Sequence, residues 1–352
     1  MTAPTLRASA ALLAVLAGTL GAPAVRAQTT SPNDTPREKL AQTTMKFLAV
    51  SLDPRAAALG DAVTAVEGMP TALFYNPASM ARQQNMTSVN VAQTQWVFNF
   101  THNAAAVSFA PMTGRYGVVG LSLQHVDYGD DFVETIRSNN AQGYDELGTY
   151  HPTAFAVGAG YAKALTDRFS VGAHVKYASV DLGSPVESRG SDGSLTRVEA
   201  KEGTFAYDFG MLYRTGFKSL NFAVSARNFS PEITYVRESA QLPLALRIGV
   251  SMNLVDLTSL SPSTHQLNAT VDALNSRDYP EQIKAGVEYG FMNTFFLRGG
   301  AVTRGGEQSL SAGFGVQRQI RNVGFGADYA YTDMGVLNTF GRVHRLGLRF
   351  SF

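Results

Sequence analysis

The sequence predicts an all-β membrane protein: a 14-stranded antiparallel β-barrel with an N-terminal helical plug in its lumen. Three observations carry this prediction. Charged residues make up 16% of the 352 residues, which is less than soluble domains usually have. Downstream of residue 27, no apolar run reaches the ~18 residues that a transmembrane helix needs. Long segments instead alternate apolar residues with small or polar ones, as membrane-spanning strands do.

The first 27 residues have the features of a secretory signal peptide. Arg7 precedes an apolar run, and Val25-Arg26-Ala27 fits the small-x-small pattern of a cleavage site. A transmembrane anchor is the alternative, but the run is short for one. We therefore expect the mature chain to begin at Gln28, to reach the bacterial outer membrane, and to start with a flexible lead-in over residues 28–44.

The composition excludes several classes of function. Loss of the two arginines in the signal takes the formal net charge from +1 to −1, which leaves no electrostatic case for nucleic-acid binding. The chain has no cysteine, so disulfides and thiolate metal sites are excluded. It also lacks a phosphate-binding glycine motif, and its six histidines are scattered. We therefore expect neither an enzyme nor a cofactor.

Residues 45–84 are expected to form the plug, which we call the hatch. Asp53-Pro54 and Asn76-Pro77 each combine a helix-capping side chain with a proline at the first helical position. Glycines interrupt the helical pattern between them, and two such short helices cannot bury their own apolar faces. The Asn76-Pro77 pair either pins the hatch to the barrel wall or only starts a helix. The hatch motif comprises Asp53, Pro54, Gly60, Asp61, Asn76 and Pro77.

Residues 85–352 are expected to form the barrel. Between residues 244 and 254, large apolar side chains alternate with small or polar ones such as Arg247. A soluble β-sandwich would also alternate, but a small packed core would not tolerate charges at mid-strand. The chain ends with Phe350 and Phe352 on the apolar face, which is similar to the assembly signal of outer-membrane barrels.

The alternation predicts fourteen strands, an even number, as in bacterial barrels. The connections are alternately short and long, and the long ones are expected outside the cell; residues 256–264 are too long for the inner turn they form. Fourteen strands enclose more space than side chains alone fill, which leaves room for the hatch. The predicted strands are residues 87–95, 99–111, 115–128, 152–165, 168–182, 203–214, 218–229, 242–255, 265–274, 282–291, 294–303, 308–317, 322–332 and 344–352.

Charged residues occupy inward positions of these strands. We expect the cations to pair with the carboxylates in a salt-bridge network that holds the hatch. The alternative is a set of separately solvated charges in a wet lumen. The cations are Arg247, Lys284, Arg298 and Arg349, and the carboxylates are Asp208, Asp272, Glu288 and Asp328.

The long outer loops carry aromatic residues that are expected to form a partner-binding surface, with a girdle at the membrane interface as the alternative. These residues are Phe132, Tyr144, Tyr150 and Tyr235. Carboxylates also crowd the first long loop and could converge on a calcium ion. A solvated polar loop is the interpretation that we favour for them, so no metal is assigned. They are Asp127, Asp130, Asp131 and Glu134.

The chain resembles the PorV/PorQ family within the FadL-like superfamily of 14-stranded outer-membrane barrels. The residues that carry this resemblance are Phe47-Leu48, the run Asp-Pro-Arg-Ala-Ala-Ala-Leu-Gly-Asp-Ala at 53–62, Ala72, Tyr75-Asn76-Pro77-Ala78, Ala226-Arg227-Asn228-Phe229 and Leu242-Pro243 through Val250. Leu59 stands where the family often has methionine.

The resemblance implies two roles. PorV-type proteins serve the type IX secretion system, where they bind secreted cargo by its C-terminal signal domain and dock on a large translocon. FadL-type proteins pass hydrophobic small molecules, such as long-chain fatty acids, inward through the hatch. We expect the first role, with the second as the alternative. Membrane lipid and the barrel-assembly machinery are expected partners in either case.

Overall fold

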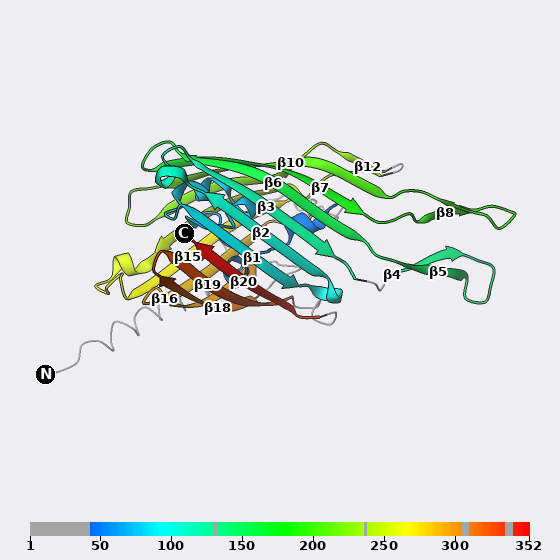
Figure 1. Cartoon of the computed structure of the whole chain (residues 1–352). Helices are drawn as coiled ribbons and strands as arrows, with labels where there is room; N and C mark the ends of the chain where they lie inside the picture. Colours follow the sequence, from blue (N-terminus) through cyan, green and yellow to red (C-terminus); the bar gives the residue numbers. More distant parts are fainter. Residues whose placement is uncertain (1–42, 130–131, 236–237, 304–309, 335–340) are drawn as a thin grey trace, which may run out of the picture. The chain divides into compact units, whose positions relative to one another are not determined.

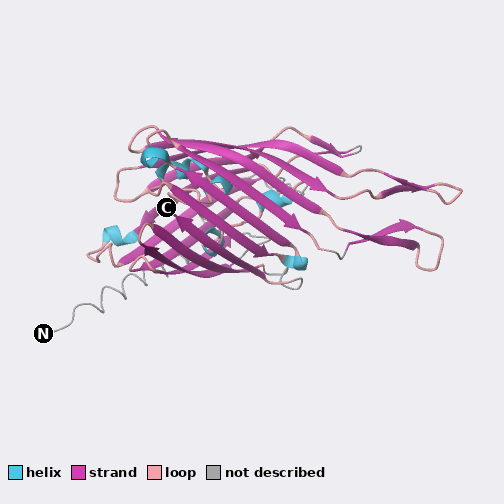
Figure 2. Ribbon diagram, in the orientation of Figure 1, coloured by secondary structure: helices cyan, strands magenta, loops and turns pink. Residues whose placement is uncertain are grey.

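A computed structural model describes residues 43–129, 132–235, 238–303, 310–334 and 341–352. Fourteen antiparallel strands close into a barrel in which β20 pairs with β1 (Figures 1 and 2). The predicted fold class is therefore confirmed. The predicted signal peptide and most of the predicted lead-in lie outside the described residues. The barrel strands are β1 (Thr87–Gln95), β2 (Thr101–Phe109), β3 (Val118–Asp127), β6 (Thr153–Ala164), β7 (Phe169–Asp181), β10 (Lys201–Arg214), β11 (Asn221–Phe229), β14 (Ala245–Asn253), β15 (His265–Ser276), β16 (Gln282–Phe291), β17 (Phe295–Thr303), β18 (Leu310–Ile320), β19 (Val323–Asp333) and β20 (Val343–Ser351).

Side chains alternate between the two faces of the wall. In β10, Asp208 is fully buried, whereas its neighbour Phe209 is 51% exposed. The outward positions carry large apolar residues, and the inward positions carry small, polar or charged ones. A one-residue slip would turn charges into lipid, so this pattern fixes the register of each strand. No helix of the described residues is long and apolar enough to span a membrane.

The register is interrupted between β10 and β11. Tyr207 pairs with Phe229, but Phe209 pairs with Ala226, so Asp208 faces two residues, Arg227 and Asn228. This is a β-bulge, and Asn228 has a left-handed φ of 61°. Both bulge residues are buried, where strict alternation would place only one of them inside. Bulges re-aim side chains in this way.

The two ends of the barrel differ. At one end lie short turns and the C-terminus, where Phe352 donates its N–H to the carbonyl oxygen of Thr87 at 2.9 Å. At the other end, three connections fold as hairpins that the sequence did not predict (Figure 1). Because outer loops are the longer ones in such barrels, the hairpin end faces outward. The hairpins are β4 (Phe132–Arg137) with β5 (Tyr144–Tyr150), β8 (Val186–Arg189) with β9 (Leu195–Arg197), and β12 (Ile233–Tyr235) with β13 (Glu238–Ala240).

The hatch consists of short helices inside the barrel. The only α-helix among the described residues is α2 (Pro54–Ala58); 3-10 helices are η2 (Lys46–Ala49), η3 (Ala72–Phe74) and η4 (Pro77–Arg82). Outside the hatch, η5 (Val97–Asn99), η6 (Pro111–Gly114) and η7 (Leu254–Leu257) lie in connections, and η7 begins the long inner turn. Leu59, Leu73 and Met80 pack with inward alanines of the wall and with Val118 in one buried cluster. The wall thus buries the apolar faces that the hatch cannot bury by itself.

Candidate functional site

Asp53 starts α2 and connects it to the rest of the hatch. Its Oδ1 accepts hydrogen bonds from the N–H groups of Arg55 at 2.6 Å and Ala56 at 3.2 Å, and its Oδ2 accepts one from the Thr71 hydroxyl. Pro54 occupies the first turn, where no N–H partner is needed. In the turn after α2, Gly60 and Asp61 have left-handed backbone conformations, with φ values of 64° and 67°, respectively.

A chain of ion pairs links the hatch to the wall. Arg55 binds Glu288 through two hydrogen bonds, from Nε at 2.8 Å and from Nη2 at 2.7 Å. Glu288 also accepts from Arg298 Nε at 2.6 Å, and Arg298 Nη1 donates to Asp328 at 2.7 Å. Arg349 lies 2.8 Å from the other oxygen of Asp328. The network predicted among Arg298, Arg349, Glu288 and Asp328 is present in the structure, and Arg55 extends it into the hatch.

Asp61 is the hatch partner of two other lumen cations. Arg247 Nη2 donates to its Oδ2 at 2.7 Å, and Lys284 Nζ donates to the same oxygen at 3.2 Å. The predicted carboxylate partners for Arg247 and Lys284 lay in the wall, so this part of the pairing was wrong. Pairing with the hatch rather than within the wall makes these cations anchors for the hatch.

Asp208 and Asp272 also have partners other than the predicted ones. Asp208 binds Lys176 Nζ at 2.7 Å and His174 Nδ1 at 2.9 Å, both from the adjacent strand β7. Asp272 accepts two hydrogen bonds from Thr64 of the hatch, from its N–H at 3.0 Å and from its hydroxyl at 2.6 Å. Sequence alternation places Asp208 and Asp272 inward correctly but cannot tell whether the partner of each comes from a neighbouring strand or from the hatch.

Asn76 both caps a helix and joins the hatch to the wall. Its Oδ1 accepts from the N–H of Ala78 at 3.0 Å, ahead of Pro77. Its Nδ2 donates to the carbonyl of Thr64 at 2.8 Å and to that of Met211, in strand β10, at 3.2 Å. Asn76 therefore starts a helix and also joins the hatch to the barrel wall, so both interpretations of the Asn76-Pro77 pair apply.

Replacing Asn76 with alanine is expected to weaken hatch docking by about 2–4 kcal/mol, because a cap, one buried hydrogen bond and one partly buried hydrogen bond are lost. Hydrogen exchange of hatch peptides in the detergent-solubilised barrel measures this loss. The exposed Asn85 gives a matched control, since N85A should change the docking free energy by less than about 0.5 kcal/mol. Equal exchange in N76A and N85A would mean that Asn76 does not anchor the hatch.

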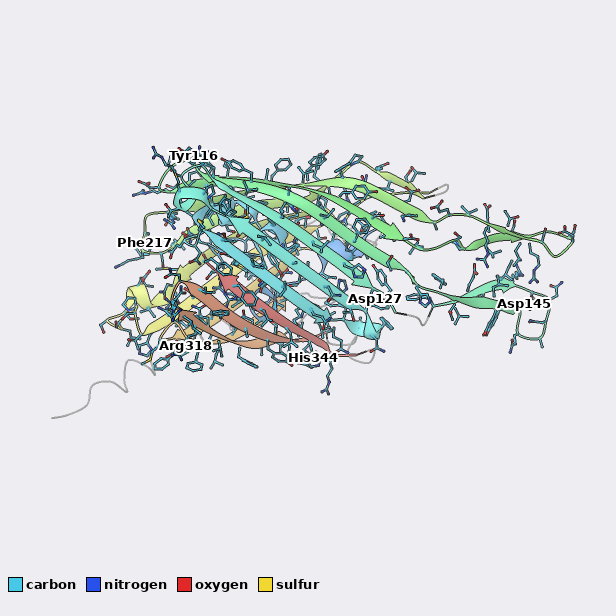
Figure 3. All side chains as sticks on the ribbon, in the orientation of Figure 1. Tyr116, Asp127, Asp145, Phe217, Arg318 and His344 are labelled. Carbon is cyan, nitrogen blue, oxygen red and sulfur yellow. The ribbon has the colours of Figure 1, made fainter. Side chains whose placement is uncertain are left out.

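Two of the outer hairpins are joined into one projection, which we call the outer arm (residues 132–150 and 183–200). Glu134 accepts a hydrogen bond from the N–H of Val186 at 2.6 Å and pairs with Arg197 at 3.1 Å. Asp145 pairs with Arg189 at 2.8 Å, and this hydrogen bond lowers the pKa of Asp145. The arm extends beyond the barrel strands, with Asp145 far from the barrel (Figure 3).

The predicted loop aromatics are not all on one surface. Phe132 packs against Tyr150 with ring centroids 5.6 Å apart and stacks on Phe100 at 6.0 Å, at the base of the arm. Tyr144 is 41% exposed near the far end. The side chain of Tyr235 lies outside the described part of the structure. Only Tyr144, therefore, is placed on the arm as an exposed aromatic contact.

The carboxylates of the first long loop do not gather in the described structure. Asp127 accepts from the N–H of Gly129 at 2.8 Å, and Glu134 is engaged in the arm. Asp130 and Asp131 lie outside the described residues. Within the described ranges, no cluster of three potential metal ligands occurs.

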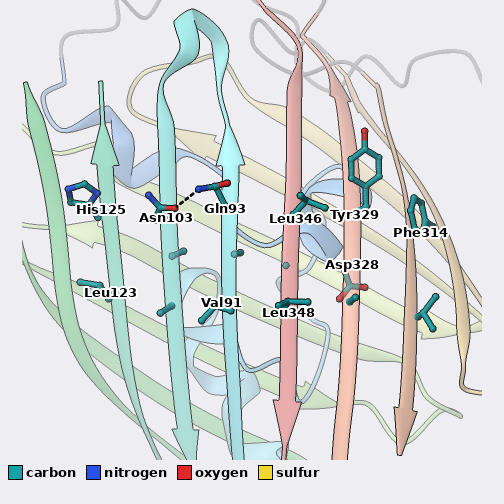
Figure 4. A pocket seen from close by; sticks show the side chains of 16 residues that line it. Val91, Gln93, Asn103, Leu123, His125, Phe314, Asp328, Tyr329, Leu346 and Leu348 are labelled. Carbon is teal, nitrogen blue, oxygen red and sulfur yellow. Dashed lines mark hydrogen bonds between the residues drawn. The ribbon is translucent and has the colours of Figure 1, made fainter. Parts of the chain in front are cut away.

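The outer wall carries a groove of about 690 Å³ across strands β18, β19, β20, β1, β2 and β3 (Figure 4). Apolar side chains such as Leu348 line it, and Gln93 donates a hydrogen bond to Asn103 at 3.1 Å within it. Its floor is continuous sheet, because β1 and β20 are paired from Ser88 with Ser351 to Gln95 with His344. The groove therefore does not open into the lumen.

Several residues that anchor the hatch or line the lumen were not among the site residues predicted from the sequence. Arg55 and Thr64 belong to the hatch, where no strand periodicity marks a direction. Lys176 and Arg345 stand at inward strand positions, so alternation could have found them. Arg227 also stands at an inward position, two residues after the buried Ser225, so alternation could have found it. The bulge adds Asn228 to the inner face, and it has no clear signal in the sequence.

Comparisons with known proteins agree with this architecture. None of the curated protein sequences matches this chain significantly. Among solved structures, the toluene transporter TbuX of Ralstonia pickettii has a TM-score of 0.52 at 13% identity, over 85% of this chain and 96% of its own. The monoaromatic hydrocarbon channel CymD has a TM-score of 0.54 at 11% identity, over 86% and 98%. The Pseudomonas putida toluene transporter TodX has a TM-score of 0.50 at 10% identity, over 84% of this chain and 96% of its own.

At these identities the likeness shows a shared fold alone. A family model described as type IX secretion system protein PorV matches residues 33–259, which is more than half of the 352 residues. This match confirms the resemblance seen in the sequence and agrees with a closed barrel of fourteen strands around an N-terminal hatch. The chain belongs to the PorV family of outer-membrane β-barrels, a family of the type IX secretion system.

Proposed function

We propose that this barrel is a non-enzymatic interaction component of type IX secretion that presents its outer arm to the translocon or to secreted cargo. The observation that carries the proposal is the arm itself. Two hairpins from different loops extend past the barrel and are joined through Glu134 and Asp145. A surface held in one arrangement binds with a smaller ordering cost than two independent loops would.

The filled lumen also supports this role over hydrophobic transport. A transporter of hydrophobic small molecules needs an apolar path past the hatch and an opening in the wall. Here the hatch contacts the wall through ion pairs such as Arg55–Glu288 and through the buried Asp61. Every neighbouring pair of barrel strands is hydrogen-bonded, including the closing pair. The hydrocarbon channels share the fold, but these polar contacts give an apolar solute no continuous route.

The other segments of the chain have roles in export and assembly under this proposal. Residues 1–27 direct export, residues 28–44 lead into the hatch, and residues 45–84 and 85–352 form the hatch and the barrel. Phe350 and Phe352 serve as the signal for the barrel-assembly machinery; Phe352 is half exposed on the outward side. Outer-membrane lipid covers the apolar wall.

Removal of one hairpin of the arm is expected to abolish partner binding. Pro185 accepts a hydrogen bond from Val198 at 3.0 Å, so residues 186–197 can be replaced by Asn-Gly, which suits a two-residue hairpin turn. Affinity capture from native membranes should then lose a large outer-membrane protein or secreted proteins that share a C-terminal domain.

The matched control is the same Asn-Gly replacement of residues 258–263, at the opposite end of the barrel, which should leave capture intact. A smaller, several-fold loss is expected for E134A combined with D145A, because exposed ion pairs contribute only about 0–1 kcal/mol each. Unchanged capture after removal of residues 186–197 would contradict the role of the arm.

A further inference from the structure

A small cavity of about 70 Å³ lies in the lumen on the outer side of the hatch. Four cations and a single carboxylate line it. The cations are Arg227, Arg247, Lys284 and Arg345, and the carboxylate is Asp61. Each of the four cations is at most 7% exposed.

Positive charge exceeds negative charge around this cavity. Asp61 serves both Arg247 and Lys284. Among the described residues, no carboxylate lies within ion-pairing distance of Arg227 or Arg345. Asp208 and Asp272 are the neighbouring wall carboxylates, but Asp208 is bound by Lys176 and Asp272 by Thr64. When Lys176, Asp208 and Asp272 are counted as well, five cations still face only three carboxylates.

Two guanidinium groups at the cavity have unused donors. The Nε atoms of Arg227 and Arg247 are buried and have no hydrogen-bond partner within the described structure. Oδ1 of Asp61 is also unpartnered, and an ordered water can satisfy it. Unpaired buried charge is costly, and Arg227 stands at an inward position of β11, two residues after the buried Ser225. The arrangement therefore favours a bound negative charge.

We propose that this cavity binds a small oxyanion, a carboxylate or phosphate group of about the size of acetate or inorganic phosphate. Planar guanidinium groups match the oxygens of such anions. The cavity has room for more than one water molecule but does not enclose a long chain. This site is independent of the arm and of the proposed role in secretion.

Anion binding also fixes the hatch. Arg227 Nη2 donates to the carbonyl of Leu48 at 3.2 Å, Arg345 Nε donates to that of Ser51 at 3.0 Å, and Arg247 Nη1 donates to that of Asp61 at 3.0 Å. Three of the four cations thus hold the hatch backbone while they face the cavity. An anion between them relieves their mutual repulsion and strengthens the closed arrangement.

The chain carries its own probe for this site. Trp96 is the single tryptophan, it lines the cavity, and the Arg345 guanidinium lies 5.5 Å from its ring centroid. Titration of the purified full-length barrel with inorganic phosphate or acetate, at constant ionic strength set by a bulky sulfonate, should change Trp96 fluorescence saturably. Phosphate should also slow hydrogen exchange of hatch peptides about tenfold or more.

The guanidinium that lies over the Trp96 ring is that of Arg345, whereas that of Arg227 lies over Tyr75, so R227Q tests the site without removing the cation–π contact of the probe. We expect at least tenfold weaker phosphate binding in R227Q and unchanged binding in R168Q, which removes an exposed arginine on a turn at the opposite end of the barrel. A linear or absent fluorescence response in the wild-type barrel would overturn the proposal even if R227Q does not fold. Equal responses of R227Q and R168Q would overturn it as well.

Discussion

The substitution E288Q is expected to raise hydrogen exchange of the hatch by about 100-fold or more, the largest effect that we predict for a single substitution. Glu288 bridges Arg55 of the hatch and Arg298 of the wall, and both its oxygens are used by Arg55. Glutamine keeps the shape but leaves two cations without their shared charge. Removing one partner of a buried pair costs about 3–5 kcal/mol. Each 1.4 kcal/mol corresponds to a tenfold change in the equilibrium constant for hatch opening.

The control for this substitution is E67Q. Glu67 also joins the hatch to the wall, through Arg214 at 2.6 Å, but the Arg214 side chain is 43% exposed. Solvent-exposed pairs contribute about 0–1 kcal/mol, so E67Q should raise exchange by less than tenfold. If E288Q exchanged no faster than E67Q, the ion-pair chain would not be what holds the hatch.

The substitution G300A is expected to displace the hatch by steric clash. A Cβ atom at Gly300 would lie 2.0 Å from the N atom of Gly60 and 2.4 Å from the carbonyl carbon of Leu59. Both are backbone atoms, so the hatch turn itself must move. Overpacking of this kind costs about 1–3 kcal/mol or more. We therefore expect hatch peptides around residue 60 to exchange at least tenfold faster and to become accessible to protease.

The neighbouring glycine provides a matched control. Gly299 points to the other face of β17, and a Cβ atom there would meet nothing within 4 Å. G299A should therefore leave both hatch exchange and barrel stability unchanged within about 0.5 kcal/mol. Similar exchange in G300A and G299A would show that the hatch does not approach β17 as closely as the structure places it.

The sequence predicted the barrel well because each strand is a local pattern. Alternation alone places β1 and β16 within the observed bounds and puts Asp208 inward and Phe209 outward. A membrane-spanning strand needs apolar side chains on the face toward lipid and small or polar side chains on the face toward the lumen. That requirement acts on every strand separately and is visible without knowledge of the fold.

The partners inside the lumen could not be predicted in the same way. Arg55 of the hatch and Glu288 of the wall are 233 positions apart in the sequence, yet they form an ion pair. Their pairing depends on how the hatch is turned within the barrel, which no strand period determines. The bulge at Arg227 and Asn228 breaks the alternation itself. The hairpins of the outer arm were missed because their strands are short and lack an apolar face.

The role in secretion can be tested by gentle extraction of the tagged barrel from its native membrane, followed by mass spectrometry of the proteins and small molecules that accompany it. We expect a very large outer-membrane protein, or secreted proteins that share a C-terminal domain, to accompany the barrel, and we expect both to be lost when residues 186–197 are removed. Fatty acids or other apolar compounds bound without any protein partner would contradict the role in secretion and would indicate transport through the lumen.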